Sequence, residues 1–471
     1  MSAEPHEAPN LDRLYSINLD GSRNFIHPAD VRGRFITWRR AMFAVLIVIY
    51  LALPILHVGG HPAVHLDIPD RKFYLFGAVY NSQDFWIVVF LVTGMAFSLL
   101  FFTAWLGRVW CGWACPQTVF LEGVYRPIER LIDGPRADRV RLMNAPWTAG
   151  KIARRVIKHL AFIAMSLLIA HVTLSLFVSW GSLLQMVRHS PGEHWEAFAW
   201  TMAIAFGFYF NFAWFREQMC IVICPYGRLQ SALTDRNSLL VGYDKDRGEP
   251  RGKVGSTKGD CVDCNRCVTV CPTGIDIRDG LQLECIACTQ CIDACDDVMD
   301  KLKRPRGLIR YDSQNGFEKK PKATVRPRLF VYGALLTVAI TGFTVSTVTR
   351  KTFEANLIRT RGAPYILETS PAGATVRNQY ELHVINKNAV PTTFHFAVWM
   401  PAGMKSDYII PQKEVTLAPL DSMRLPVFVT VDRGGYHGPF DVTVDVTDDT
   451  SKVHRQARAR FLGPQSGAPG G

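Results

Sequence analysis

Eight cysteines between positions 261 and 295 form two runs with one spacing. In each run three cysteines are separated by two residues, and a fourth follows after three more. In bacterial proteins this spacing holds pairs of [4Fe–4S] cubes, because three thiolates bind one cube and the fourth crosses over to the other. We therefore predict two [4Fe–4S] clusters. The predicted ligand sets are Cys261, Cys264, Cys267 and Cys295 for one cube, and Cys285, Cys288, Cys291 and Cys271 for the other.

Structural zinc is the alternative for these runs, since Cys-x2-Cys pairs also bind zinc. Zinc ribbons use two pairs of cysteines, whereas this chain has two runs of four, so clusters are favoured. One detail departs from the usual pattern: Asp296, not proline, follows Cys295. Cluster assembly needs reduced thiols, so we expect this ferredoxin-like segment to lie in the cytoplasm.

A second cysteine motif, Cys-x3-Cys-Pro, occurs twice beside long apolar segments. The flanks WCGWACPQTVFLEGVYR and MCIVICPYGRLQSALTDR agree loosely, which indicates a diverged internal repeat. Residues i and i+4 of a helix share a face, so each motif should point two sulfurs the same way, with the proline ending the helix or allowing a turn. The four residues are Cys111, Cys115, Cys220 and Cys224.

If the two motifs are neighbours, their four sulfurs form a site for a soft metal ion, and Cu(I) is the ion most in need of thiolates. A disulfide within one motif is disfavoured, because Cβ atoms at i and i+4 lie about 5–6 Å apart, whereas a disulfide needs about 3.5–4.5 Å. The alternative is that these cysteines are small buried hydrophobic residues. Two copies in a chain that also carries clusters favour a metal or redox role.

The segments that must position these sites are predicted membrane spans. The chain has 471 residues, of which 48% are hydrophobic and 20% charged. Five stretches approach the length of about 20 apolar residues that a bilayer requires, and their cores contain no Asp, Glu, Lys or Arg. They are residues 41–57, 85–107, 158–180, 196–215 and 329–349.

The distribution of lysine and arginine predicts the orientation of these spans. Arginines crowd the segment before the first span, and both residue types crowd the segments between the second and third spans and before the fifth. We therefore expect a bacterial inner-membrane protein with a cytoplasmic N-terminus, cytoplasmic cysteine runs and a periplasmic C-terminal segment. The net charge of +12 then reflects topology and contact with anionic lipid rather than nucleic acid. Residues 1–30 are polar and do not resemble a signal peptide.

The C-terminal part after residue 349 changes character. Short segments of alternating polarity, separated by Gly and Pro, predict a small β-sandwich. They are residues 380–386, 393–398, 414–419, 424–431, 441–446 and 457–462. No cysteine follows position 295, so a disulfide cannot stabilise this domain.

The predicted architecture is thus an α-helical polytopic membrane protein with two additional domains. Its parts are a cytoplasmic tail (1–40), four spans with both Cys-x3-Cys-Pro motifs (41–225), a ferredoxin-type domain with linkers (226–328), a fifth span (329–349) and the periplasmic sandwich (350–471).

Histidines gather in the loops expected outside. Such residues at a membrane surface are candidates for function, and they could bind copper or haem. A structural role is the favoured interpretation, because Pro54 and the nearby glycines make the first loop irregular. The histidines are His57, His61 and His65 in one loop, and His171, His189 and His194 in or near the other.

With these motifs in hand, the chain closely resembles the cytochrome c oxidase accessory family known as CcoG, FixG or RdxA. The resemblance covers nearly the whole chain and includes WCGWACPQTVF, ICPYGRLQ, both cysteine runs and PRGLIRY at 305–311. It implies an immunoglobulin-like C-terminal domain and a role in assembly of the cbb3-type haem–copper oxidase. It also implies reduction of Cu(II) to Cu(I), with the eight clustered cysteines as cluster ligands and Cys111, Cys115, Cys220 and Cys224 as the copper and catalytic site.

The partners that this resemblance implies are a cytoplasmic electron donor, a copper chaperone or transporter, and oxidase assembly factors; a homodimer is also compatible. Two other readings stay open. One is a quinol dehydrogenase-type membrane ferredoxin that passes electrons between the quinone pool and a periplasmic partner. The other is an assembly scaffold without redox activity. The fifth span and the sandwich favour the oxidase accessory family over the quinol reading.

Overall fold

The computed structural model describes residues 25–69, 71–81, 84–253, 259–323, 325–370, 373–388, 390–401 and 406–464. The chain divides into two compact units. One contains the long helices and the ferredoxin-like segment and ends at Phe343. The other begins at Thr344 and also takes in Val79–Asn81.

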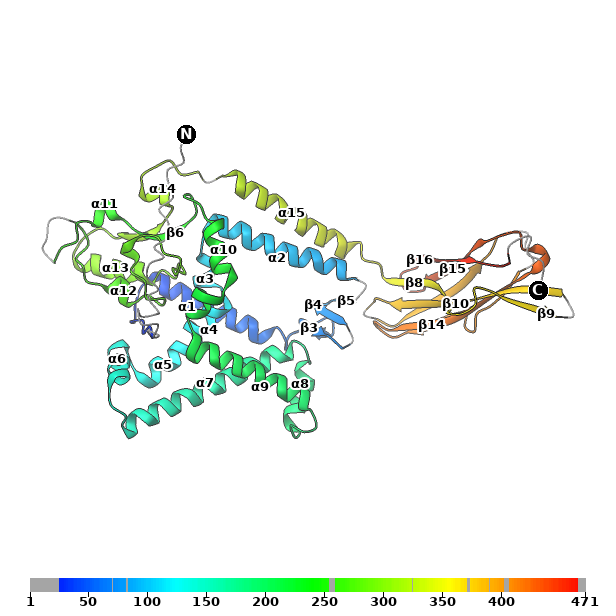
Figure 1. The fold of residues 1–471 in the computed structure, drawn as a ribbon, viewed down its shortest axis with the longest axis horizontal. Helices are drawn as coiled ribbons and strands as arrows, with labels where there is room; N and C mark the ends of the chain where they lie inside the picture. Colours follow the sequence, from blue (N-terminus) through cyan, green and yellow to red (C-terminus); the bar gives the residue numbers. More distant parts are fainter. Residues whose placement is uncertain are drawn as a thin grey trace. The chain divides into compact units, whose positions relative to one another are not determined.

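Five helices are long and apolar enough to cross a membrane. Between 11% and 33% of the residues in their most apolar windows are buried, so most of their side chains face outward, as expected for contact with lipid. Figure 1 shows α15 running beside α2, and Gly94 of α2 approaches Ala339 of α15. These helices are α1 (Arg34–Ala52), α2 (Phe85–Leu106), α7 (Ala149–Ser175), α9 (Trp195–Tyr209) with its π-helical extension η3 (Phe210–Phe215), and α15 (Pro327–Val348).

Two of the five predicted spans are displaced along the chain. The first was expected at 41–57, but α1 ends at Ala52, just before Pro54, which cannot continue a helix without loss of a hydrogen bond. The third was expected at 158–180, but α7 begins at Ala149, where the Thr148 hydroxyl accepts the N–H of Lys151 and caps the helix. Hydropathy locates the apolar part of a helix but does not detect polar turns that extend the helix beyond it.

The first turn of α1 is capped by the ferredoxin-like segment. The backbone N–H groups of Phe35 and Ile36 donate to the Asp293 carboxylate, the latter at 2.7 Å. The N–H groups of a first helical turn have no partner within the helix, and an anion there is stabilised by the helix dipole. Asp293 lies on α13, so this contact joins the ferredoxin-like segment to a membrane helix.

Shorter elements connect the spans. After α2 come α3 (Val109–Trp113), α4 (Pro116–Phe120), the π-helix η2 (Leu121–Tyr125), α5 (Arg126–Asp133) and α6 (Arg136–Asn144). After α7 comes α8 (Trp180–Arg188), and after η3 come the π-helix η4 (Met219–Ile223) and α10 (Pro225–Leu233). Between α1 and α2 lie β1 (His57–Val58), β2 (His61–Pro62), β3 (Val64–Asp67), β4 (Lys72–Leu75) and β5 (Ala78–Asn81).

The ferredoxin-like segment is built on one antiparallel strand pair, β6 (Leu240–Tyr243) with β7 (Ile309–Asp312). Its other elements are α11 (Lys245–Gly248), α12 (Arg266–Thr269), η5 (Ile277–Asp279), α13 (Gln290–Lys301) and α14 (Gln314–Phe317). Its apolar core includes Ile275, Ile292, Met299 and Leu308, which pack around the cysteines.

The C-terminal unit contains a sandwich of two antiparallel sheets. One has the order β12-β14-β10-β8 with β9 beside β10, and the other has the order β13-β11-β15-β16. Their inner faces share one core that includes Phe353, Tyr380, Phe394 and Phe461. The strands are β8 (Phe353–Arg359), β9 (Ile366–Ser370), β10 (Gly373–Asn386), β11 (Thr392–Trp399), β12 (Ser406–Ile409), β13 (Glu414–Leu417), β14 (Ser422–Asp432), β15 (Phe440–Asp448) and β16 (His454–Phe461).

All six predicted strand segments fall on strands of this sandwich. Sequence reasoning missed β8, β9 and β12. In β8 only Phe353 and Leu357 are buried, and their spacing does not give strict alternation. The strand is nevertheless fixed by its pairing with β10, a contact that a local pattern cannot show.

Candidate electron-transfer and metal site

The structure gathers the eight clustered cysteines into the two sets that the spacing predicts. One cavity is lined by the first set, in which Cys295 joins the three leading cysteines of the earlier run. A second cavity is lined by the other set, in which Cys271 crosses over in the opposite direction, and Cys267 of the first set lines this cavity as well. The first set is Cys261, Cys264, Cys267 and Cys295; the second is Cys271, Cys285, Cys288 and Cys291. Their role as cluster ligands stays a prediction.

The surroundings of both cavities fit an iron–sulfur cube. Burial raises the pKa of Cys267 and of Cys288 to about 12, so without a metal these thiols hold their protons. Iron reverses this preference, because a coordinating thiol is deprotonated by the metal charge. Apolar side chains such as Ile275 and Ile277 line the second cavity and limit access of water, which helps to set the potential of a bound cluster.

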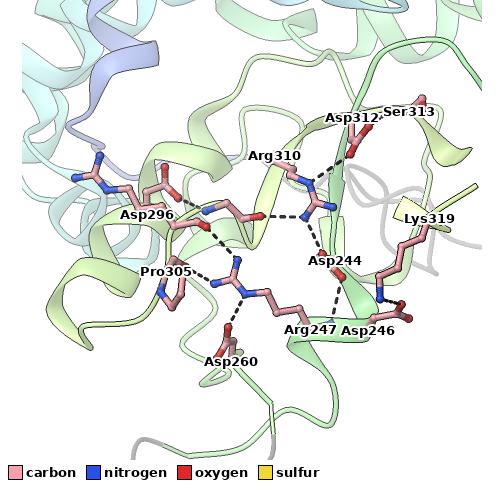
Figure 2. Close-up of polar contacts among 12 residues, drawn as sticks. Asp244, Asp246, Arg247, Asp260, Asp296, Pro305, Arg310, Asp312, Ser313 and Lys319 are labelled. Atoms are coloured by element: carbon pink, nitrogen blue, oxygen red, sulfur yellow. Dashed lines mark hydrogen bonds and ion pairs between the residues drawn. The ribbon is translucent and has the colours of Figure 1, made fainter. Parts of the chain in front are cut away.

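Polar contacts of two aspartates hold both ends of the first cysteine set in place (Figure 2). Asp296 follows Cys295 and accepts the backbone N–H of Gly307 at 3.0 Å. Asp260 precedes Cys261 and pairs with Arg247, which also donates to the carbonyl of Arg306 at 3.0 Å. Both ends of the set are thereby anchored to the loop 305–307. Asp296, which stands where proline was expected, therefore helps to hold this end of the cysteine set in place.

A third group of contacts holds the same loop against the strand pair. Arg310 of β7 donates to Asp244 at 2.7 Å and to the carbonyl of Gly307 at 3.2 Å (Figure 2). Lys319 pairs with Asp246 at 3.0 Å. The exposed Lys319 pair contributes little, whereas the Arg310 contacts join strand, loop and cysteine set.

The second cysteine set lies against the first Cys-x3-Cys-Pro motif. Gly112 is buried there, and a Cβ atom added to it would stand 2.5 Å from the carbonyl oxygen of Ile286 and 2.9 Å from the backbone of Cys288. Only glycine permits so close an approach. Arg39 of α1 fixes the same point, since its Nε donates to the carbonyl of Gly112 at 2.7 Å.

Arg108 and Tyr311 strengthen this junction. The Arg108 guanidinium donates to the carbonyls of Leu283 and Cys285 in the cluster loop, and to that of Gly227 at 3.1 Å. The Tyr311 hydroxyl donates to the carbonyl of Ala287 at 3.1 Å and accepts the indole N–H of Trp113 at 3.2 Å. The loop that carries Cys285 and Cys288 is thus hydrogen-bonded to Arg108 beside the first membrane motif, and Arg108 in turn donates to Gly227 beside the second.

The backbone of the Cys-x3-Cys-Pro motifs differs from the expected helix. Cys115 and Cys224 are extended, with φ −62° in both and ψ 127° and 110°. Each is the N-cap of a new helix that begins with the following proline. Proline favours the extended conformation in the residue before it and is tolerated at the first helical position, where no N–H is needed. The expectation that both cysteines of a motif lie on one helix was wrong: the helix ends before Cys115 and before Cys224, and the proline after each turn starts the next helix.

The two motifs share unusual backbone details, which supports the internal repeat. The N–H of Cys115 donates to the carbonyl of Trp110 at 2.9 Å, and the N–H of Cys224 donates to that of Met219 at 2.8 Å, five residues back in both cases. The preceding helices also end alike, at Gly107 with φ 59° and ψ −123° and at Arg216 with φ 49° and ψ −119°.

Arg216 adopts a conformation that favours glycine, and a buried ion pair holds it there. Its guanidinium donates to both carboxylate oxygens of Glu129 at 3.1 Å. Burial by itself would raise the pKa of Glu129, but Arg216 and Lys158 outweigh burial and lower the pKa to about 2. The carboxylate is therefore charged at neutral pH and anchors the second repeat.

Polar side chains brace each motif against the other. Gln117 follows Cys115 and donates to the carbonyl of Arg216 at 3.0 Å and to the side chain of Asn211 at 3.1 Å. In the opposite direction, Gln230 of α10 donates to the sulfur of Cys111 at 3.1 Å. The two motifs are neighbours, as the prediction of a shared site requires.

The four cysteines lie close enough to influence one another electrostatically, and we call them the four-cysteine site. Burial, with smaller contributions from neighbouring cysteines of the site, raises the pKa of Cys111 to about 11 and that of Cys220 to about 12. The Cys115 pKa is also raised by burial, against the N–H groups of Gln117 and Thr118, which favour its thiolate. All four cysteines are partly exposed and free of disulfides. Across the described ranges, no three His, Cys, Asp or Glu side chains already have the geometry to hold one metal ion.

The loop histidines make local contacts. The rings of His61 and His65 both pack on Tyr74, at 4.6 and 5.6 Å between centroids. His189 and His194 face each other at 6.0 Å. The Nδ1 atoms of His57 and His171 lie 2.8 and 2.7 Å from backbone carbonyls. These contacts test neither the favoured structural role of the histidines nor the alternative metal role.

Sequence reasoning missed the residues that assemble the site. In the sequence, Arg39 indicates only the orientation of a span, and no pattern marks Arg108. Gly112 and Gln117 lie within or beside the motif, with no sign of their contacts. One signal was available: glycine between the two cysteines of a motif, where backbone can approach closely.

An apolar helical region with two cysteine motifs, a ferredoxin-like segment and a sandwich define a membrane-bound iron–sulfur electron-transfer protein. Comparisons agree with this class. Residues 215–314 match the family model "4Fe-4S dicluster domain", residues 85–135 match "4Fe-4S binding domain", and residues 343–464 match the model for the Ig-like fold at the C-terminal of FixG.

The chain is similar to the "Nitrogen fixation protein FixG" of Rhizobium meliloti, with 33% identity and 88% of each chain covered. It is 36% identical to "Protein RdxA" of Cereibacter sphaeroides, over 82% of this chain and 85% of that protein. It is 32% identical to "Protein RdxB" of the same organism, over 88% and 91%. The chain belongs to the FixG/RdxA family, as predicted.

Among solved structures, a FixG-related protein from Vibrio parahaemolyticus matches 24% of this chain and 97% of its own, with 19% identity and a TM-score of 0.21. A likeness at that score carries no argument about the site.

Proposed function

We propose that this protein reduces Cu(II) to Cu(I) at the four-cysteine site, in the inner-membrane route that supplies copper to a cbb3-type oxidase. The observation that carries the proposal is the contact of Gly112 with the Ile286–Cys288 loop. It places a group of soft-metal ligands directly beside a predicted cluster site. A packing role for the four cysteines would not require that proximity.

The ligand chemistry supports this direction of reaction. Cu(II) prefers nitrogen and oxygen ligands, whereas Cu(I) prefers sulfur. Thiolates therefore stabilise the product, and each Cu(II) needs one electron to become Cu(I). The [4Fe–4S] clusters, when bound, supply one-electron transfer; the electrons come from a cytoplasmic reductant.

The chain's own residues prepare the site for copper. Gln230 holds the Cys111 sulfur at 3.1 Å, and the N–H groups at the start of α4 face Cys115. Partial burial raises the pKa of Cys111, Cys115 and Cys220, so these thiols stay protonated until a metal displaces the protons. Arg39 and Arg108 hold the cluster loop against the motif, so the separation between the two sites stays short.

Orientation is part of the proposal. We place the ferredoxin-like segment and the four-cysteine site on the cytoplasmic side and the sandwich in the periplasm, as the lysine and arginine distribution favours. A reporter that is active only outside should be active when fused after Glu354 and silent after Arg310. The reverse pattern would contradict this orientation.

The central test is a reductase assay on anaerobically purified protein. The protein is reduced with dithionite, mixed with Cu(II), and followed by cluster absorbance and by a Cu(I)-specific chelator. Reoxidation of the clusters with formation of about one Cu(I) per electron supports the proposal. Cluster reduction by quinol, with no reaction toward Cu(II), would favour the quinol dehydrogenase reading; no redox response to either would favour the scaffold.

A further inference from the structure

A cavity of about 690 Å³ lies beside the first half of α1. Residues of α1 form one wall, and residues of η2 and α5 form another. Gln290, which precedes Cys291 on α13, lines it from the ferredoxin-like segment. Its volume lies within the range of about 300–1,000 Å³ that small-molecule sites occupy.

Positive side chains dominate the lining of this cavity, which we call the arginine cavity. It has five arginines and two carboxylates. Both carboxylates already have partners, since Glu122 pairs with Arg126, and Asp30 pairs with Arg130 at 3.1 Å. The arginines are Arg39, Arg40, Arg126, Arg130 and Arg139.

Three of these arginines are buried with a donor left over. Arg39 is 0% exposed, Arg126 7% and Arg139 5%. Within the described part of the chain, Arg39 Nη2, Arg126 Nε and Arg139 Nε have no hydrogen-bond partner. A buried charged donor without a partner is unfavourable, although each of these guanidiniums has other contacts, such as that of Arg126 with Glu217 at 3.5 Å. Because all three arginines line the cavity, a ligand that brings anionic oxygens there would add to these contacts.

Farther along α1 the lining of the cavity is apolar. Phe43, Ala44 and Ile47 of α1 line it, in the part of the helix that is apolar enough to lie in a bilayer. Leu131, another lining residue, is 86% exposed. A soluble anion would use the arginines and leave this wall bare. A phospholipid would place its phosphate on the arginines and the start of its acyl chains on the apolar wall.

We propose that the arginine cavity binds one phospholipid with an anionic headgroup. The site is independent of the copper reaction. Its effect follows from Arg39, which lines the cavity and also donates to Gly112 at the junction between the two cysteine sites. A lipid phosphate on the arginines neutralises like charges that would otherwise repel each other there, and so stabilises the docked ferredoxin-like segment.

The test measures lipid retention and thermal stability of the full-length, cluster-loaded protein in a non-ionic detergent. Native mass spectrometry should show about one anionic phospholipid per chain. Added phosphatidylglycerol should raise the unfolding temperature, whereas phosphatidylcholine with the same acyl chains and inorganic phosphate should not. Each charge-assisted hydrogen bond is worth roughly tenfold in affinity, so Arg40→Gln/Arg130→Gln should bind phosphatidylglycerol at least about tenfold more weakly.

The matched control is Arg141→Gln/Arg154→Gln, which removes the same charge from exposed positions outside the cavity. It should retain lipid like the wild type. Arg139→Gln is the second variant, with iron content as the check that it has folded. Equal retention by all variants, or an equal thermal shift with phosphatidylcholine, would overturn the proposal. A shift of the same size with inorganic phosphate would show a soluble-anion site instead and would equally reject a lipid.

Discussion

The eight cysteines of the ferredoxin-like segment reach their two cavities along one short stretch of chain, whereas the four-cysteine site draws on two motifs that α7 and α9 separate. In the first region, local spacing decides which sulfurs meet. In the second, each motif presents two cysteines, and side chains such as Gln117 and Gln230 bring the pairs together. Loss of one cysteine should therefore disrupt the ferredoxin-like segment as a whole, whereas it should weaken metal binding at the four-cysteine site only in part.

The largest effect is expected from Cys288→Ser, because it removes a predicted cluster ligand that also lies beside Gly112. Iron should fall from about eight atoms per chain to about half or less, and Cu(II) reduction should be lost. Iron and labile sulfide analysis of anaerobically purified protein checks this outcome. A variant with full iron would show that Cys288 is not a ligand.

The next largest effect is expected from Cys111→Ser/Cys115→Ser. Copper binding and the initial rate of Cu(II) reduction should be abolished while iron content stays at the wild-type value, since the predicted cluster ligands lie elsewhere. A single substitution should be milder, because three thiolates can still hold Cu(I). If rate and copper stoichiometry are unchanged in the double variant, the four cysteines only pack, and copper must be reduced elsewhere.

Gly112→Ala tests the contact between the two regions by itself, because it leaves every cysteine in place. The new Cβ would stand 2.5 Å from the Ile286 oxygen, and such overpacking costs roughly 1–3 kcal/mol. We expect a slower transfer of electrons to Cu(II), with iron content and copper affinity close to those of the wild type.

The matched control for this variant is Gly150→Ala. Gly150 lies on α7 with no atom within 4 Å of an added Cβ, so transfer rate and stability should not fall. Stopped-flow measurement of cluster reoxidation by Cu(II) separates the two variants. Equal rates would mean that the contact at Gly112 does not set the separation between the sites.

The smallest effect is expected from Gln230→Leu, which removes one hydrogen bond to the Cys111 sulfur. A bond of this kind contributes roughly 0.5–1.5 kcal/mol, so Cu(I) affinity should fall by about three- to tenfold. Competition with a Cu(I) chelator measures it. Leu229→Ala, at an exposed position of the same helix, serves as control and should leave affinity unchanged.

Sequence alone predicted the features that depend on residues close together in the chain. The grouping of Cys271 and Cys295 follows from ligand spacing, and the sandwich follows from alternating strands. The course of the chain at Cys115 and Cys224 could also have been read locally, because the following proline forces an extended residue. The prediction that each pair of cysteines shares a helical face neglects this effect of proline, and the structure corrects it.

The remainder depends on contacts between distant residues. No pattern shows that Asp293 caps α1, since neither sequence neighbourhood contains the other. Arg39 was counted only as a charge that orients a span, yet it is fully buried at the junction. Such residues become visible only when the chain is folded, because their partners are backbone N–H and carbonyl groups rather than complementary side chains.

The contact at Gly112 has a consequence for maturation. The loop that rests on it carries Cys285 and Cys288, so the surface used for docking is also the wall of a predicted cluster cavity. An assembly protein that delivers iron and sulfide needs access to that wall. Cofactor insertion must therefore precede closure of the loop onto the membrane helices, or the loop must reopen.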